Sequence, residues 1–364
     1  MAFHPTGIYK MDYGADEGLF PTPFITASSI TFFLFLLLLP LFFSKHIVFL
    51  STTVFIAVIG AVGLNILTGM TGQISIAQGA LIGVGAYTCG YFTENLGMPL
   101  WISIPSGGLI TTLVGLIFGL PSIRIKGLYL LMSTLAAQFF LANYLFTQWA
   151  AVTKGQEGFV LNRPAFPGIP GNPNFGISLY DDSRFYYLVL LIAALTVFAG
   201  INLGRSKTGR ALRAVRDRDI AASLIGINIT RYKLIAFALS SFVVGICGAL
   251  TAYSSKAFYP ASFGLDISIA YLAMIICGGI GSVRGAILGA IFITLLPDGV
   301  LYFMNTVVID MLPSWYNWGY LYSGLHAILY GSTIVLFLIL EPEGLNKIWI
   351  NFRNSITIWP FPYY

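Results

Sequence analysis

The sequence predicts an all-α, polytopic bundle of transmembrane helices with about ten spans (about 8–10). Of the 364 residues, 57% are hydrophobic and only 9% are charged, and the mean hydropathy is +0.83. Soluble domains carry about 25% charged residues. A soluble globule of this size cannot hide so much apolar surface from water, so its solvent must be lipid. Ten-residue segments of alternating polarity are absent, which argues against a membrane β-barrel.

The spans follow from apolar runs of about 20 residues, the length that crosses a bilayer core. No small-residue cleavage site follows the first run, so we expect a retained helix rather than a signal peptide. Residues 1–24 form a predicted N-terminal tail, 25–340 a single membrane domain and 341–364 a C-terminal tail. The predicted spans are 25–43, 47–69, 74–93, 101–121, 127–148, 185–203, 234–254, 267–283, 285–304 and 321–340.

The distribution of Lys and Arg predicts the orientation. With ten spans and a cytoplasmic N-terminus, 14 of the 19 basic residues fall inside and 5 outside. This bias follows the positive-inside rule, and eight of the 14 lie in one loop, 204–233. Both termini are therefore expected in the cytoplasm.

Small residues recur at a spacing of four, so that one face of several predicted helices carries no bulky side chain. Because lipid gives no hydrophobic drive between helices, close backbone approach must supply the contact. The structural interpretation is tight packing within one bundle, and the functional one is that some glycines mark moving or broken helices along a path. The stripes are Gly79–Gly83, Ala86–Gly90, Gly115–Gly119 and Gly281–Gly285–Gly289.

Reactive side chains are scarce in the predicted spans. Cys89, Cys247 and Cys277 lie in apolar stretches without paired spacing, which is typical of small buried hydrophobes. No carboxylate pair or Asp–His chain occupies a span centre, which disfavours a proton- or sodium-driven secondary transporter. The lack of a His/Asp/Glu cluster disfavours an intramembrane enzyme. We expect no catalytic residue, no metal site and no nucleic-acid partner.

One segment places polar side chains at a predicted helix break. Residues 63–87 read GLNILTGMTGQISIAQGALIGVGAY, and Gly69 and Gly72 flank the break. A break frees backbone donors and acceptors, which lipid cannot satisfy. The segment is either a turn whose amides bond neighbouring helices or a polar surface beside a translocation route. The candidates for such a route are Asn65, Gly69, Gly72, Gln73, Ser75 and Gln78, with Gln138 on the fifth span.

The basic loop 204–233 predicts an amphipathic helix outside the membrane. Thr208 is placed to cap its start and Gly226 to end it, and Leu212, Val215 and Ala222 share one side. The helix either lies among lipid headgroups or binds a protein. Acidic residues among its arginines and a small-residue stretch favour the protein. The candidate contact residues are Arg210, Arg213, Arg216, Asp217, Asp219, Ala221, Ala222 and Gly226.

The end of this loop resembles a known motif. Residues 221–226 read AASLIG and resemble the EAA loop of permeases from ATP-binding-cassette (ABC) importers, with Ile220 in the position of the motif's glutamate. Longer blocks are similar to branched-chain amino-acid permeases of the LivM type. They read GRALRAVRDRDIAASLIGINITRYKLIAFALSS, GLNILTGMTGQISIAQGALIGVGAY, RIKGLYLLMSTLA, GGIGSVRGAILGA and EPEGL, and extend from residue 63 to 345.

The resemblance implies a permease subunit in the cytoplasmic membrane of a bacterium. The loop would be a coupling helix that ATPase subunits bind and move as they close on ATP. This chain has no GxxxxGK[ST] sequence to cradle phosphates, so it would bind no cofactor itself and would use ATP through a separate ATPase. A second, homologous permease and an extracytoplasmic solute-binding protein complete the implied assembly. The family also includes permeases for urea, short amides and aromatic acids.

A long loop, 149–184, is predicted on the outer side. Loops of this length are usually functional or disordered. It contains Lys154, Glu157, Arg163 and Arg184 together with several Pro and Gly residues. We expect it either to dock the solute-binding protein or to act as a covering lid.

Overall fold

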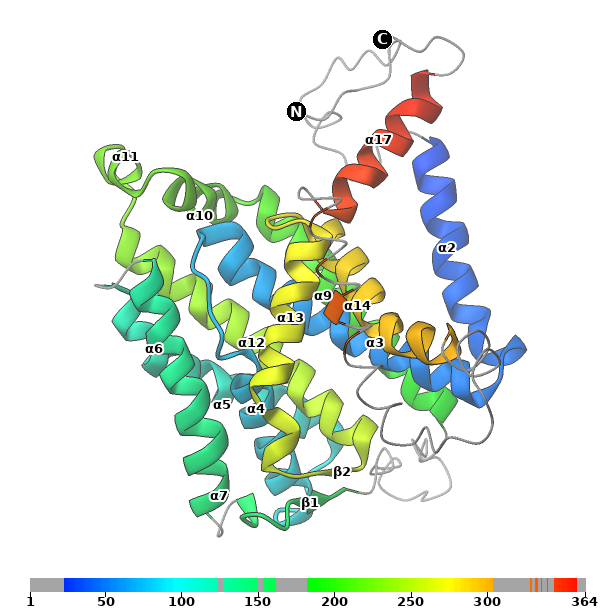
Figure 1. Cartoon of the computed structure of the whole chain (residues 1–364), viewed down its shortest axis with the longest axis vertical. Helices are drawn as coiled ribbons and strands as arrows, with labels where there is room; N and C mark the ends of the chain where they lie inside the picture. Colours follow the sequence, from blue (N-terminus) through cyan, green and yellow to red (C-terminus); the bar gives the residue numbers. More distant parts are fainter. Residues whose placement is uncertain are drawn as a thin grey trace, which may run out of the picture.

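The computed structural model describes residues 23–123, 127–149, 153–161, 182–303 and 344–358, together with residues 328, 331, 332, 335 and 339. Helices dominate these residues (Figure 1). The first half of the chain contains α2 (Pro23–Phe42), α3 (Lys45–Leu64), the π-helix η1 (Asn65–Gly69), α4 (Gln78–Glu94), α5 (Leu100–Gly119), η2 (Leu120–Ile123), α6 (Leu128–Phe139), the π-helix η3 (Phe140–Leu145), α7 (Phe146–Gln148) and β1 (Phe159–Val160).

The second half continues the same architecture. It contains α9 (Asp182–Arg205), α10 (Lys207–Asp217), α11 (Asp219–Leu224), α12 (Ile229–Ser255), β2 (Ala257–Phe258), η5 (Pro260–Phe263), α13 (Leu265–Gly278), α14 (Val283–Phe303) and α17 (Leu345–Ile358). A helix therefore covers each of the first nine predicted spans. The tenth prediction, 321–340, falls outside the described residues apart from five single positions.

Six helical segments among the described residues are long and apolar enough to cross a membrane. They are Lys45–Gly69, Leu100–Gly119, Tyr129–Gln148, Asp182–Arg205, Ile229–Ser255 and Pro260–Gly278. The chain is thus an all-α, multi-pass membrane protein. These six segments support several membrane spans, and the number of about ten stays a prediction. The predicted C-terminal tail, 341–364, contains the helix α17.

Helix α12 lies at the centre of the bundle, where it packs on α3, α4 and α5. Side-chain size rather than polarity separates the inner and outer faces of α5. Leu109, Leu113 and Ile117 follow one stripe and are 60%, 62% and 62% exposed, whereas Gly108 and Gly115 face Phe242 and Ser241 of α12. Large apolar side chains outside and small ones inside are the arrangement expected for helices in lipid.

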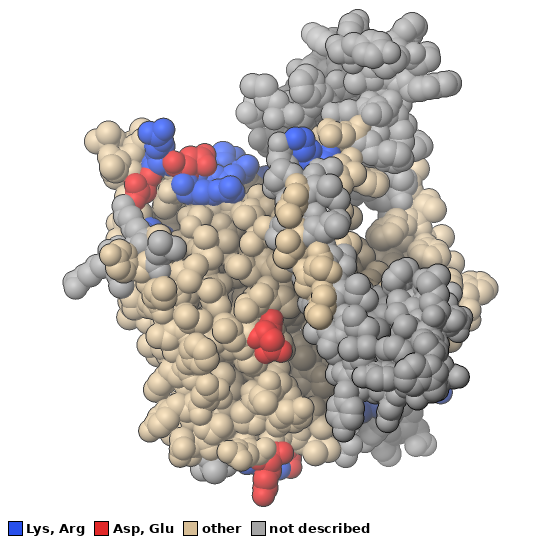
Figure 2. All heavy atoms as spheres, in the orientation of Figure 1, with Lys and Arg blue, Asp and Glu red and all other residues tan. Residues whose placement is uncertain are grey.

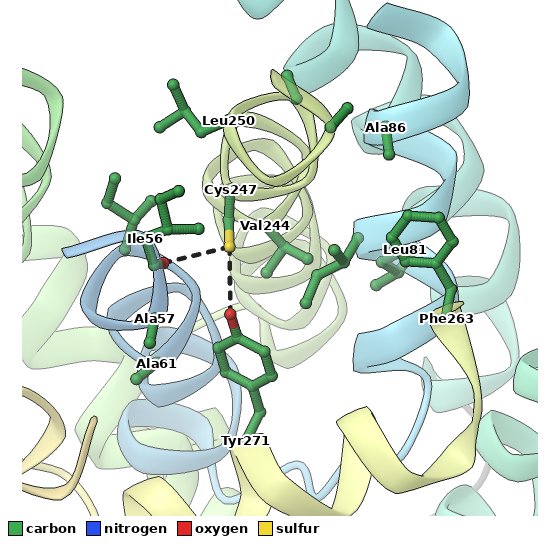
Figure 3. Close-up of a cluster of buried hydrophobic side chains, with 14 of the residues drawn as sticks. Ile56, Ala57, Ala61, Leu81, Ala86, Val244, Cys247, Leu250, Phe263 and Tyr271 are labelled. Carbon is green, nitrogen blue, oxygen red and sulfur yellow. Dashed lines mark hydrogen bonds between the residues drawn. The ribbon is translucent and has the colours of Figure 1, made fainter. Parts of the chain in front are cut away.

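The three cysteines are free and buried, as predicted. Figure 3 shows Cys247 on α12 between α3 and α13. Its sulfur lies 3.3 Å from the Ile56 carbonyl oxygen, to which it donates, and 3.4 Å from the hydroxyl of Tyr271. Cys247 therefore contributes weak polar contacts besides filling space in the core.

Charged side chains gather at one end of the molecule. On the face shown in Figure 2, most Lys and Arg residues lie over α10 and α11, and the flank of the bundle below them is almost entirely uncharged. Figure 1 shows β1 at the opposite end, and Lys154, which lies over the ring of Phe159 in β1, forms an ion pair there with Glu94. This distribution fits a bundle with an apolar belt between two polar ends.

Candidate functional site

The predicted break after the second span is present, and it has two parts. The helix first widens into the π-helical turn η1 and then ends at Thr71, after which Gly72 adopts a φ of +70°. Residues 72–77 are not helical, and α4 begins only at Gln78 rather than at the predicted 74. In Figure 1 this segment runs from the end that carries α10 into the middle of the bundle. The first turn of α4 therefore lies inside the protein.

Two side chains from other helices satisfy that first turn. Ser268 of α13 accepts a hydrogen bond from the Gly79 amide at 2.8 Å. The Gln138 side-chain oxygen, from α6, accepts one from the Ala80 amide at 2.7 Å. The Gln138 amide nitrogen donates to the Phe263 carbonyl at 2.9 Å. Gln138 thus joins α6, α4 and η5 around a helix end that lipid could not satisfy.

The remaining polar residues of the segment are also buried, with local or neighbouring partners. Gln78 donates to the Gly60 carbonyl at 3.1 Å, and Ser75 accepts from the Ala77 amide at 3.3 Å. Asn65 and Gln73 are 1% and 4% exposed. Among the described residues, the Nδ2 atom of Asn65 and the Oε1 atom of Gln73 have no hydrogen-bond partner. These two atoms are a donor and an acceptor that a polar solute could satisfy.

Sequence reasoning missed Ser268 and Thr134. Thr134 of α6 accepts a hydrogen bond from the Ile76 amide at 3.2 Å. Both are small hydroxyl residues in mostly apolar helices, far from the segment along the chain, and nothing in their local sequence indicates the contact. The predicted residues Gln73 and Gln138, by contrast, are amides inside apolar runs, which is a visible signal.

The loop 204–233, predicted to be cytoplasmic, forms two short helices, α10 and α11, with an extended residue, Arg218, between them. This differs from the single helix predicted from Thr208 to Gly226. Ser206 caps α10, because its side chain accepts a hydrogen bond from the Gly209 amide at 3.0 Å, so the assignment of the cap to Thr208 is wrong. The extended Arg218 ends α10 before α11 begins.

The predicted end of the loop helix is confirmed. Gly226 has a φ of +85°, the Ile227 amide donates to the Ala222 carbonyl, and the Gly226 amide donates to the Ser223 carbonyl. This pair of bonds is a Schellman motif, whose left-handed position favours glycine. The space around a Cβ at Gly226 is open, so the backbone conformation and not a close neighbour requires glycine there.

The inner side of the loop packs on the bundle. Leu212, Val215 and Ala222 are 0%, 5% and 2% exposed. Leu212 joins a cluster with Leu67 and Met70 beside the helix break. Ala222 is therefore covered by this chain itself and offers no surface to a partner.

The exposed apolar residues of the loop lie on α11 and just after it. Ile220, Leu224 and Ile225, here called the apolar tip, are 73%, 83% and 74% exposed. Ala221 is also exposed, and the carboxylates Asp217 and Asp219 lie just before the tip. Figure 1 shows α11 at the outer corner of this end of the bundle. An apolar patch rimmed by charge is a feature of protein-binding surfaces.

The loop arginines contact different parts of the chain. Arg210 donates to the Arg205 carbonyl at 2.8 Å. Arg213 donates to the carbonyls of Gly204 and Gly209 within the same loop region. Arg216 instead donates to the carbonyl of Gly69, at the end of the π-helical turn. Arg216 is thus the loop arginine that reaches the broken helix.

The opposite end carries the described part of the long loop that was predicted on the outer side. This part contains β1, which pairs with β2 in antiparallel register, Phe159 opposite Phe258. The two rings stack with centroids 5.8 Å apart, and Lys154 lies over the Phe159 ring at 4.9 Å while it pairs with Glu94. Arg184 belongs to α9 rather than to a loop, and Arg163 lies outside the described residues.

Similarity to known proteins covers most of the chain. LivM, the high-affinity branched-chain amino acid transport system permease protein of Salmonella typhimurium, is 29% identical over 350 residues, which are 90% of this chain and 77% of LivM. LivM of Escherichia coli is 29% identical over 322 residues, 84% of this chain and 71% of that protein. LivH of Salmonella typhimurium is 25% identical over 250 residues, 64% of this chain and 78% of LivH.

No solved structure matches the chain. The family described as "Branched-chain amino acid transport system / permease component" matches residues 46–338. This range includes the broken helix, α10 and α11, and the β1–β2 pair. Because the match extends over most of the sequence, the chain belongs to the family of branched-chain amino acid transport system permease components.

Proposed function

We propose that the chain is the membrane-spanning permease subunit of an ABC importer in the bacterial cytoplasmic membrane. It works with separate ATPase subunits that bind and hydrolyse ATP, with a second homologous permease, and with an extracytoplasmic solute-binding protein. Membrane lipid surrounds the remaining outer surface. Family membership and the apolar tip of the cytoplasmic loop support this function.

The apolar tip is the observation that carries the ATPase assignment. Three large apolar side chains on a charged loop outside the spans would be exposed to water without a partner. A lipid-surface role is disfavoured because the other apolar side of the loop, around Leu212, packs on the bundle. Asp217 and Asp219 near the tip also weaken attraction to anionic lipid. A groove in an ATPase subunit would cover the tip.

Replacing Leu224 with Glu tests this role. A buried, unpaired charge at an interface costs about 2–5 kcal/mol, or about 30-fold or more in affinity. We expect Leu224→Glu to reach the membrane but to lose the ATPase when the complex is purified in detergent. Leu96→Glu, in the turn after α4, makes the same change at a 50% exposed leucine and should retain the ATPase.

Retention of the ATPase at wild-type stoichiometry by both Leu224→Glu and Ile225→Glu would contradict the docking role. A lipid-surface role predicts that these variants keep the ATPase and bind anionic vesicles less well. A secondary transporter, the less favoured mechanism, predicts uptake that follows an ion gradient and needs no ATP. Uptake into proteoliposomes with ATP but no gradient separates these mechanisms.

The polar segment around the helix break supports a translocation route. Its residues lie around a break whose following helix, α4, starts inside the bundle; they are Asn65, Gly69, Gly72, Gln73, Ser75 and Gln78, with Gln138. A buried polar atom without a partner costs about 1–3 kcal/mol, and Gln73 Oε1 and Asn65 Nδ2 are such atoms among the described residues. A passing polar solute would offset that cost.

Gln73→Leu tests the route because it removes the unpaired oxygen and keeps the size of the side chain. We expect uptake at sub-saturating solute to fall about tenfold, because the loss of one hydrogen bond to the solute costs about 1.4 kcal/mol. Thr294→Val on α14 removes another buried, unpaired oxygen outside the segment and should leave uptake near wild type. Equal effects of the two substitutions would argue against a route at Gln73.

The proposed solutes are branched-chain amino acids, the solutes named for the LivM and LivH relatives. Urea, short amides and aromatic acids are the alternatives. We propose that the solute-binding protein docks at the outer loop, whose β1–β2 pair supplies an ordered platform. Calorimetric titration of that binding protein with leucine, urea and phenylacetate distinguishes the substrate classes. Tight binding of urea or phenylacetate without leucine binding would contradict the amino-acid assignment.

A further inference from the structure

Arg216 lies where three segments of the chain meet. It belongs to α10 of the cytoplasmic loop, and its guanidinium donates a hydrogen bond to the Gly69 carbonyl at the end of the π-helical turn. The third segment is the turn between α13 and α14. There the Gly281 amide donates to the Asn65 side-chain oxygen at 2.9 Å. One side chain of the loop therefore contacts the site of the helix break directly.

Glycines make room for this arginine. A Cβ at Gly281 would overlap the Arg216 guanidinium, and a Cβ at Gly69 would lie 2.8 Å from the Gly281 amide nitrogen. A Cβ at Gly72 would lie 3.3 Å from Cγ of Arg216. Such short separations mean that any side chain at Gly69 or Gly281 would displace its neighbours. Gly72 and Gly281 therefore leave room for the Arg216 side chain, whereas Gly69 leaves room for Asn65 and supplies the carbonyl that accepts the hydrogen bond from Arg216.

The connection is both apolar and polar. Leu212, one turn before Arg216, is 0% exposed and packs with Leu67 and Met70 on the same broken helix. The contact of Leu212 resists separation but allows sliding, because packing is not directional. The Arg216 hydrogen bond adds direction, since a charged donor on a C-terminal helix carbonyl favours one geometry. A displacement of α10 would therefore pull on Gly69.

We infer that Arg216 is a positioning residue that links movement of the cytoplasmic loop to the helix break. When a partner moves α10 and α11, Arg216 transmits the displacement to residues 65–77 and, through Asn65 and Gly281, to the α13–α14 turn. The π-helical turn η1 is the element that absorbs it, since such turns are irregular points within a helix. This inference rests on the proposed function, because the ATPase is the partner that moves the loop.

The test uses the assembled transporter in proteoliposomes with its ATPase, second permease and binding protein. In Arg216→Gln, the ATPase should remain bound and hydrolyse ATP, while the number of solute molecules transported per ATP should fall about tenfold. A change of this size corresponds to the loss of one hydrogen bond from a charged donor. Arg216→Lys keeps a charged donor, so it should retain most of the wild-type ratio of solute transported to ATP hydrolysed. Arg231→Gln, at an exposed arginine of the same loop, should behave as wild type.

The outcomes separate the two proposals. An ATPase that never co-purifies with the wild-type chain refutes the proposed function, whereas a wild-type transport ratio in Arg216→Gln refutes the link alone. Loss of the ATPase from Arg216→Gln would also refute the link, because Arg216 would then belong to the docking surface. If Arg216→Gln fails to insert, hydrogen exchange in the wild-type complex decides. Protection of the Gly72 amide, bonded to the Thr68 carbonyl, should change between nucleotide-free and ATP-bound states, and unchanged protection overturns the link.

Discussion

At the scale of single residues, glycines set how closely the helices approach. A Cβ at Gly285 on α14 would lie 2.5 Å from the Gly278 carbonyl oxygen and 2.6 Å from that of Gly279. Backbone atoms cannot move aside as a flexible side chain can, so Gly285→Leu must separate α13 from α14. We expect it to cost about 1–3 kcal/mol and to reduce uptake while the protein still inserts into the membrane.

Gly299→Leu is the matched control, because it lies on the same helix and nothing lies within 4 Å of its added Cβ. It should keep wild-type uptake and a wild-type melting temperature in detergent. Gly72→Leu should also harm uptake, since Gly72 has a φ of +70°. Normal uptake by both Gly285→Leu and Gly72→Leu would contradict the view that close backbone packing at these sites matters for transport.

The three cysteines are a residue-scale case in which burial excludes reactivity. Cys89, Cys247 and Cys277 are each 0% exposed and free. A variant with Ala at positions 89 and 277 and Ser at 247, which replaces the thiol beside Tyr271 with a hydroxyl, should lose about 1 kcal/mol or less per site. Its uptake should match wild type and should not change with reductant. A loss of uptake without a matching loss of thermal stability would assign one thiol a role in transport.

At the scale of elements, the buried start of α4 depends on Gln138. Gln138→Leu removes the acceptor of the Ala80 amide and the donor to the Phe263 carbonyl. These buried backbone groups are then unpaired, which should lower the free energy of unfolding by about 1–3 kcal/mol for each group. We expect a lower melting temperature and reduced uptake. Asn143→Leu, at an exposed amide on the same span, should change neither quantity. If the two variants melt alike, Gln138 does not hold the start of α4.

The extent of prediction from sequence differs between elements and contacts. Helices cover the first nine predicted spans because apolar runs of sufficient length are a local property, and the break at Gly72 follows from nearby glycines. The bond from Arg216 to Gly69 joins residues 147 positions apart, so local sequence carries no sign of it. Gly281, predicted as part of a helical stripe, instead has a φ of +92° in the turn before α14. Local patterns thus predict elements, while contacts depend on the packing of distant segments.

At the scale of the whole molecule, the charge distribution implies one orientation in the membrane. The loop with α10 and α11 carries Lys and Arg at one end, and the ion pair of Lys154 with Glu94 lies beside β1 at the other. The bias in basic residues predicts that the first end lies in the cytoplasm. We therefore predict that both termini are cytoplasmic and that the β1–β2 pair faces outward.

Cysteine labelling in intact cells tests this orientation on a chain without its native thiols. A membrane-impermeant maleimide should label a cysteine introduced at Lys154, whose side chain is 39% exposed. It should label cysteines at Arg213 and Asn351, both also exposed, only after the cells are opened. The two inner positions lie on α10 and α17, so they report independently on the loop and on the C-terminal helix. Labelling at Arg213 in intact cells would show that the protein has the opposite orientation in the membrane. The apolar tip would then lie outside the cell, where a cytoplasmic ATPase could not bind it.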